Sequence, residues 1–96
     1  MKNLTEFSST VRMFAFLIKD GYSVSRAVEI LAQQTTGELG KMFTKASSLL
    51  KSGSSTADAL SSAGFPKELC SIASVGEKSG YMAEALELYG VYLEKA

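Results

Sequence analysis

Glu84 and Glu87 are the first residues of this sequence whose types and spacing could do chemistry. Two carboxylates held close together can act as acid and base in catalysis, or they can bind a cation. Residues three apart in a helix are neighbours on its surface, where both carboxylates reach water. We therefore interpret the pair as part of a solvated helix face, with acid-base chemistry and a cation site as the alternatives.

The composition removes most other catalytic chemistry. The sequence has no histidine, the commonest general base and a frequent metal ligand. Its single cysteine, Cys70, has no second thiol or imidazole with which to form a disulfide or a zinc site. No glycine-rich loop ends in Gly-Lys-Ser or Gly-Lys-Thr to hold a phosphate. We predict that the protein is not an enzyme and binds no metal or cofactor. Cys70 is interpreted as a small residue of the hydrophobic core.

One segment, residues 21–31, is similar to the turn and second helix of a helix-turn-helix DNA reader. Such readers place serine and arginine near the start of the helix and add several cations that contact phosphates. Here Arg26 is the one basic residue between Tyr22 and Gln34, and Glu29 lies close to it. Ten Lys and Arg also balance ten Asp and Glu over the whole chain, so no general attraction to phosphate is expected. A DNA-binding regulator is kept as the alternative function.

The elements that must position these residues are all predicted to be helices. Apolar residues recur at helical spacing in six segments, no strand-length alternation is present, and Pro66 is the single proline. The first four predicted helices cover about residues 4–19, 23–31, 38–51 and 55–63. The fifth begins at Pro66, which is expected in its first turn, and the sixth runs from about Tyr81 to the end. We predict an all-α fold, a six-helix antiparallel bundle made of helical hairpins.

A Lys-x-Gly pattern recurs at the ends of these helices. Residues 17–23 align with residues 49–55 without a gap, and the match extends to Ala27 and Ala59. A partial third copy begins at Lys78. The lysine suits the negative end of the helix dipole, and the glycine accepts the left-handed conformation that ends a helix. The serine two residues later is a good N-cap for the next helix. The pattern therefore indicates a duplicated hairpin, with the same turn used three times.

The first and last helices each carry a second apolar row beside the one that faces the core. Two interpretations remain open: either both helices bury wide faces within the monomer, or the second rows bind a partner or a second copy. Tyrosine favours the second interpretation, because it is enriched at interfaces. The candidate partner surface consists of Met13, Phe16, Leu17, Tyr81, Leu88 and Tyr92.

The segment Gly76-Glu77-Lys78-Ser79-Gly80, followed by a helix with a Tyr92-Leu93 ending, resembles the F domain of bacterial type II secretion and type IV pilus systems. The family's motif is Gly-Glu-x-Ser-Gly, here Gly76, Glu77, Ser79 and Gly80. The family's opening hairpin, Leu-x-x-Gly-x-Ser-x-x-x-Ala, is matched from Ile18 onward, except that isoleucine stands in place of leucine. The resemblance covers nearly the whole chain.

This resemblance implies a six-helix bundle formed by residues 1–96 as a single F domain. The domain would be soluble, on the cytoplasmic face of the bacterial inner membrane, in a platform protein whose membrane helices lie outside this sequence. Its implied partners are the motor ATPase, other platform proteins, pilin and further copies of itself, but not nucleic acid. A type IV pilus member, such as a toxin-coregulated pilus platform protein, is the expected system. Within the motif, Glu77 is expected either to satisfy donors at a helix start or to contact a partner.

Overall fold

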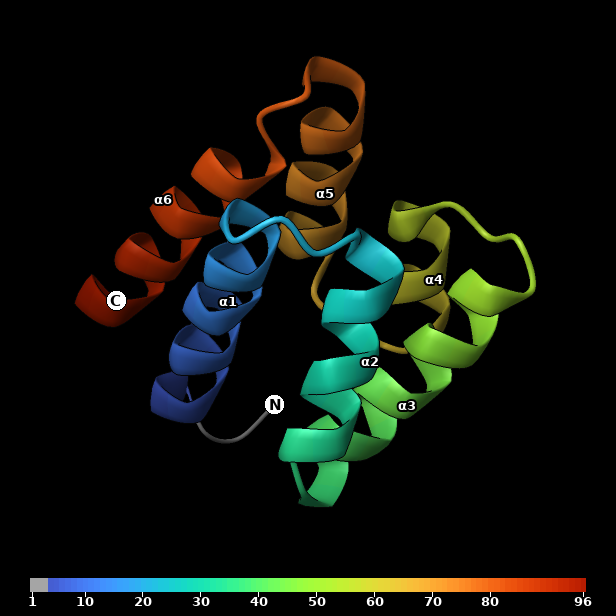
Figure 1. Ribbon diagram of the computed structural model, residues 1–96. Helices are drawn as coiled ribbons and strands as arrows, with labels where there is room; N and C mark the ends of the chain where they lie inside the picture. Colours follow the sequence, from blue (N-terminus) through green and yellow to red (C-terminus); the bar gives the residue numbers. More distant parts are fainter. Residues whose placement is uncertain (1–3) are drawn as a thin grey trace.

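The computed structural model describes residues 4–96, and within that range it contains six helices and no strand. Figure 1 shows their order along the chain. The helices are α1 (Leu4–Lys19), α2 (Val24–Gln34), α3 (Gly37–Lys51), α4 (Thr56–Ser62), α5 (Lys67–Ser79) and α6 (Met82–Lys95). The predicted all-α fold built from helical hairpins is confirmed.

Each helix packs against the next one in the chain, and α1 also packs along α6. Figure 1 shows α1, α5 and α6 on one side of the molecule and α2, α3 and α4 on the other. The core between them is apolar and closely packed, as its fully buried phenylalanines Phe14 and Phe43 show. Because α1 and α6 come from opposite ends of the chain, their pairing closes the bundle.

The first two Lys-x-Gly turns have the same geometry. Gly21 and Gly53 have φ angles of 106° and 104°, which only glycine adopts without strain. At the first turn the amide of Tyr22 donates to the carbonyl of Leu17 over 3.1 Å, and the matching bond at the second turn is 3.0 Å. In both turns a serine Oγ then accepts a 3.1 Å bond from the third residue of the following helix. The repeated sequence therefore produces a repeated hairpin turn.

The third Lys-x-Gly turn is different, which corrects the prediction of one turn used three times. Gly80, with φ of 83°, ends α5 through a single bond from its amide to the carbonyl of Gly76. The residue that precedes α6 is Tyr81, whose side chain makes no capping bond. In the first two turns, the amide that follows the glycine donates to a carbonyl five residues earlier. The same bond is found at Gly64, where the amide of Phe65 donates to the carbonyl of Leu60. No lysine precedes that turn, so glycine alone is sufficient for it.

Two further expectations need adjustment. Pro66 lies just before α5, in the N-cap position with ψ of 147°, and not in the first turn of the helix. Cys70 packs against the core but is only partly buried, and its Sγ lies 3.9 Å from the carbonyl oxygen of Phe65. Burial raises the pKa of the Cys70 thiol, so the protonated form is favoured.

Candidate docking surface and signature segment

The signature segment, residues 76–80, forms the end of α5 and the turn toward α6, and its Glu77 also reaches α4. Gly76 is buried, and a Cβ added to it would lie 2.8 Å from the Cα of Met82, the first residue of α6. A backbone atom cannot rotate out of the way as a flexible side chain can. Gly76 therefore permits the close approach of α5 and α6.

Glu77 satisfies donors at the start of a neighbouring helix. Its Oε2 accepts hydrogen bonds from the backbone amide of Thr56 over 3.3 Å and from the Thr56 hydroxyl. Thr56 is the first residue of α4 and is only 2% exposed. The first amides of a helix have no partner within it, and a carboxylate also interacts favourably with the helix dipole. These bonds correspond to the first of the two roles expected for Glu77, and the helix whose donors it satisfies is α4, twenty-one residues earlier in the chain.

Ser79 and Gly80 shape the turn between α5 and α6. The Ser79 Oγ accepts a 3.2 Å bond from the amide of Tyr81, and Gly80 supplies the left-handed residue that ends α5. All four motif residues therefore have a structural role at one joint. The sequence predicted two possible roles for Glu77, but not which helix its carboxylate would contact.

Five of the six residues predicted for the partner surface are exposed. The side chains of Phe16, Tyr81, Leu88 and Tyr92 are between 60% and 72% exposed, and Met13 is 43% exposed. Leu17 is the exception, because it is only 8% exposed and belongs to the core. It follows Phe14 by three residues, so it lies about 60° from that buried side chain around α1 and faces inward. Leu17 is therefore removed from the predicted surface.

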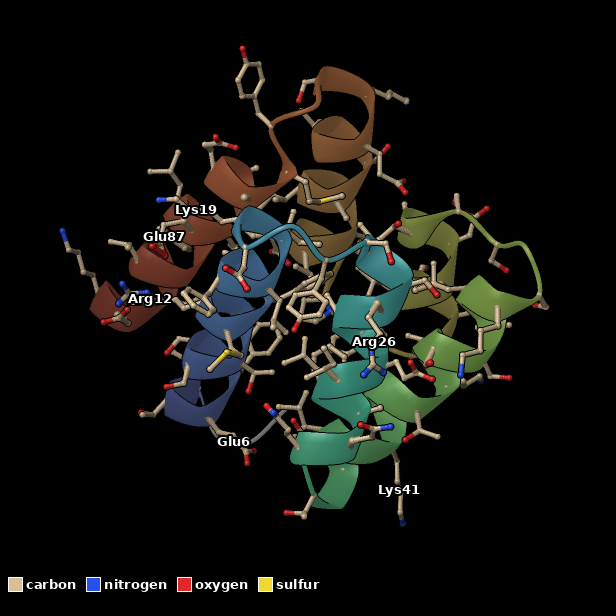
Figure 2. All side chains as sticks on the ribbon, viewed as in Figure 1. Glu6, Arg12, Lys19, Arg26, Lys41 and Glu87 are labelled. Atoms are coloured by element: carbon tan, nitrogen blue, oxygen red, sulfur yellow. The ribbon has the colours of Figure 1, made fainter. Side chains whose placement is uncertain are left out.

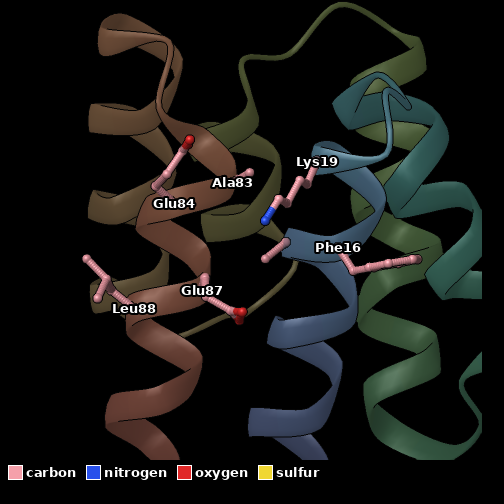
Figure 3. A pocket seen from close by; sticks show the side chains of 7 residues that line it. Phe16, Lys19, Ala83, Glu84, Glu87 and Leu88 are labelled. Atoms are coloured by element: carbon pink, nitrogen blue, oxygen red, sulfur yellow. The ribbon is translucent and has the colours of Figure 1, made fainter.

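The five exposed residues form two groups, Met13 and Phe16 on α1, and Tyr81, Leu88 and Tyr92 along the outer side of α6 or just before it. In Figure 3, Phe16 points away from α6 and Leu88 points away from α1. They are thus the two edges of a groove and not neighbours in one patch. The ring of Tyr92 stacks on that of Tyr89, with centroids 6.5 Å apart.

A charged cluster that sequence reasoning missed joins α1 to α6. Arg12 Nε lies 3.2 Å from Glu87, and its Nη1 lies 2.5 Å from Glu94; Figure 2 shows Arg12 and Glu87 near each other. The hydrogen bonds that Arg12 donates to Glu94 and Glu87 raise the pKa of its guanidinium. Gly90 lies under the aliphatic stem of Arg12 and leaves room for it. Glu87 was interpreted as part of a solvated face, and it is exposed but ion-paired.

The charged side chains of the segment considered for DNA binding also form ion pairs within the protein. Arg26 Nη1 lies 2.5 Å from the Glu29 carboxylate. The Nζ of Lys51, on α3, lies 2.7 Å from the same carboxylate. Hydrogen bonds from Lys51 and then Arg26 lower the pKa of the Glu29 carboxyl. The cation that would have approached DNA is thus engaged within the protein. No observation favours the DNA-binding alternative.

Residues 4–96 offer neither a metal site of clustered ligands nor a membrane span. They contain no group of three or more His, Cys, Asp or Glu side chains placed to hold a metal ion. Among the helices in the same range, none has the length and apolarity needed to cross a membrane.

Comparisons with known proteins place these features in a family. The family model of type II secretion system protein F matches residues 10–96. The match includes most of α1, all later helices and the whole signature segment. A search of curated proteins gave no match.

Proposed function

Because this chain belongs to the family of type II secretion system protein F, we propose that it is a noncatalytic scaffold domain of an inner-membrane platform protein that serves type II secretion or type IV pilus assembly. Residues 1–96 would form one F domain on the cytoplasmic face of the membrane. The observation that carries this proposal is the family match over residues 10–96.

The proposed partners are the motor ATPase of the system, other platform proteins, pilin and further copies of the chain. Support for a docking role comes from the exposed apolar side chains of α1 and α6, because exposed apolar surface of this kind often marks a site of protein interaction. The signature segment supports the same surface indirectly. It brings α5 close to the first residue of α6, and its Ser79 Oγ accepts a bond from the amide of Tyr81.

A pull-down of the purified motor ATPase by this chain tests the proposal. The variant Tyr81→Ser/Tyr92→Ser should retain much less ATPase than the wild-type chain, because aromatic anchors dominate most interfaces. Tyr22→Ser is the matched control, since Tyr22 is 42% exposed but lies in the turn between α1 and α2. Equal retention by all three proteins would exclude Tyr81 and Tyr92 as the docking surface. Absence of binding by the wild-type chain would refute the proposed docking role itself.

A further inference from the structure

The large apolar side chains exposed by this protein are concentrated on two helices. Within residues 4–96, the structure exposes eight of them, and none lies within α2, α3 or α4. Six belong to α1, to α6 or to the residue that precedes α6, namely Leu4, Met13, Phe16, Tyr81, Leu88 and Tyr92. The other two are Tyr22 and Val75. The face formed by α1 and α6 therefore carries most of these side chains, and they form two groups on either side of the line where the helices meet.

A groove runs along this face between α1 and α6. Its deeper part has a volume of about 460 Å³, with small residues, Ala15 and Ala83, among those that line it and Phe16 and Leu88 at its edges. A shallower hollow continues from Phe16 and Glu87 past Arg12 to Glu94. From residue 84 to residue 94, α6 rises by about 15 Å, which is the length of about three turns of helix. The whole groove thus has the length of one partner helix, and its deeper part has the apolar walls that suit such a helix.

The charges of the groove differ between its two ends. In the shallow end Arg12 is occupied by Glu87 and Glu94. At the deep end Lys19 on α1 faces α6 near Glu84 (Figure 3). Neither of these two side chains has a hydrogen bond or an ion pair within residues 4–96. A cation and an anion therefore remain unpaired beside the apolar walls.

From these observations we propose that the groove binds an amphipathic helix of a protein partner, of about three turns. Its apolar ridge lies between Phe16 and Leu88, with a basic residue that pairs with Glu84 and an acidic residue that pairs with Lys19. This inference rests on the proposed docking function and specifies its surface. An anionic lipid surface fits less well, because three carboxylates, those of Glu84, Glu87 and Glu94, line the groove.

The affinity of the chain for the purified motor ATPase tests this inference through two pairs of matched variants. Leu88→Ser and Val75→Ser each remove an exposed apolar residue, within the groove and on α5 respectively. Glu84→Lys and Glu38→Lys each reverse a charge in the first turn of a helix, α6 and α3 respectively. The groove variants should each raise Kd at least tenfold, whereas the control variants should change it less than twofold. Circular dichroism and Tm of all four variants verify that each one folds.

Each outcome bears on a different claim. If the groove variants bind as tightly as the controls do, the groove is overturned while the proposed docking function stands. If the wild-type chain binds no ATPase, the proposed function fails and the inference fails with it. Flotation with vesicles that contain phosphatidylglycerol provides a further arm. Vesicle binding that is lost in Leu88→Ser, with ATPase binding unchanged, would identify the occupant as lipid and overturn the partner helix.

Discussion

Replacing Glu77 by alanine removes the carboxylate that joins the end of α5 to the start of α4. Both hydrogen bonds that it accepts come from Thr56, one from the backbone amide over 3.3 Å and one from the hydroxyl. Thr56 is 2% exposed, so water cannot readily replace the lost acceptor. The variant Glu77→Ala should therefore leave two donors at the first turn of α4 without a partner.

The expected loss of stability is about 1–2 kcal/mol. A hydrogen bond to a charged group contributes roughly 1.5–3 kcal/mol when it is shielded from water. Glu77 itself is exposed, so its carboxylate is partly solvated and the value must be reduced. The loss of a side-chain cap costs about 1 kcal/mol in other helices, which agrees with the reduced value. For a domain of this length, 1 kcal/mol corresponds to a fall in Tm of roughly 4–8 °C. Glu77→Gln should lose about half as much, because the amide oxygen can still accept.

Thermal and urea unfolding of a double-mutant cycle measures this interaction. The cycle consists of the wild-type chain, Glu77→Ala, Thr56→Val and the double variant. If the carboxylate caps α4, the sum of the losses in unfolding free energy of the two single variants should exceed the loss of the double variant by about 1 kcal/mol. A coupling energy near zero, together with a change of less than about 0.3 kcal/mol for Glu77→Ala, would refute the capping role. Glu77 would then be a candidate for direct contact with a partner.

Further predictions concern the backbone and one carboxyl group. Gly76→Ala should destabilise the protein by about 1–3 kcal/mol, because the new methyl group would lie 2.8 Å from the Cα of Met82; an unchanged Tm would contradict the close packing of α5 and α6. Gly21→Ala and Gly53→Ala should each cost about 1–2 kcal/mol, since both glycines are left-handed and nothing else crowds the added methyl group. Losses that differ by more than about 1 kcal/mol in urea unfolding would show that the two turns are not equivalent. The Glu29 carboxyl should titrate below its ordinary pKa because of its two cationic partners. Its contribution to stability is then present above the unfolded-state pKa and is lost as the pH falls through the lower folded-state pKa. An NMR titration that places its midpoint at or above the ordinary value would contradict these ion pairs.

Much of the fold could be predicted because its signals are local. A helix needs a cap at its start and a stop at its end, and Ser23, Ser55, Gly21 and Gly53 provide these within a few residues of sequence. The third turn could not be distinguished in the same way. Lys78-Ser79-Gly80 has the right residues, but its geometry depends on how closely Gly76 approaches α6.

The candidate surface shows where periodicity stops being informative. Spacing around a helix places Phe16 and Leu17 side by side in the second row of α1, and it treats them alike. In the structure Phe16 is 60% exposed and Leu17 is 8% exposed. The difference arises because the boundary of the buried sector depends on which helices pack against α1, and only the folded chain determines that.

By itself, the sequence determined the six helices, the chemistry of their turns and the motif that indicates the family. These features depend on residues that are close together in the chain, so residue type and spacing are sufficient to predict them. The tertiary structure alone decided that Arg12 pairs with Glu87 and Glu94, 75 and 82 residues away, and that Glu77 caps α4. It also decided that α1 and α6 border a common groove. Contacts between distant segments depend on how the helices pack against one another, and the pattern within a single helix does not contain that information.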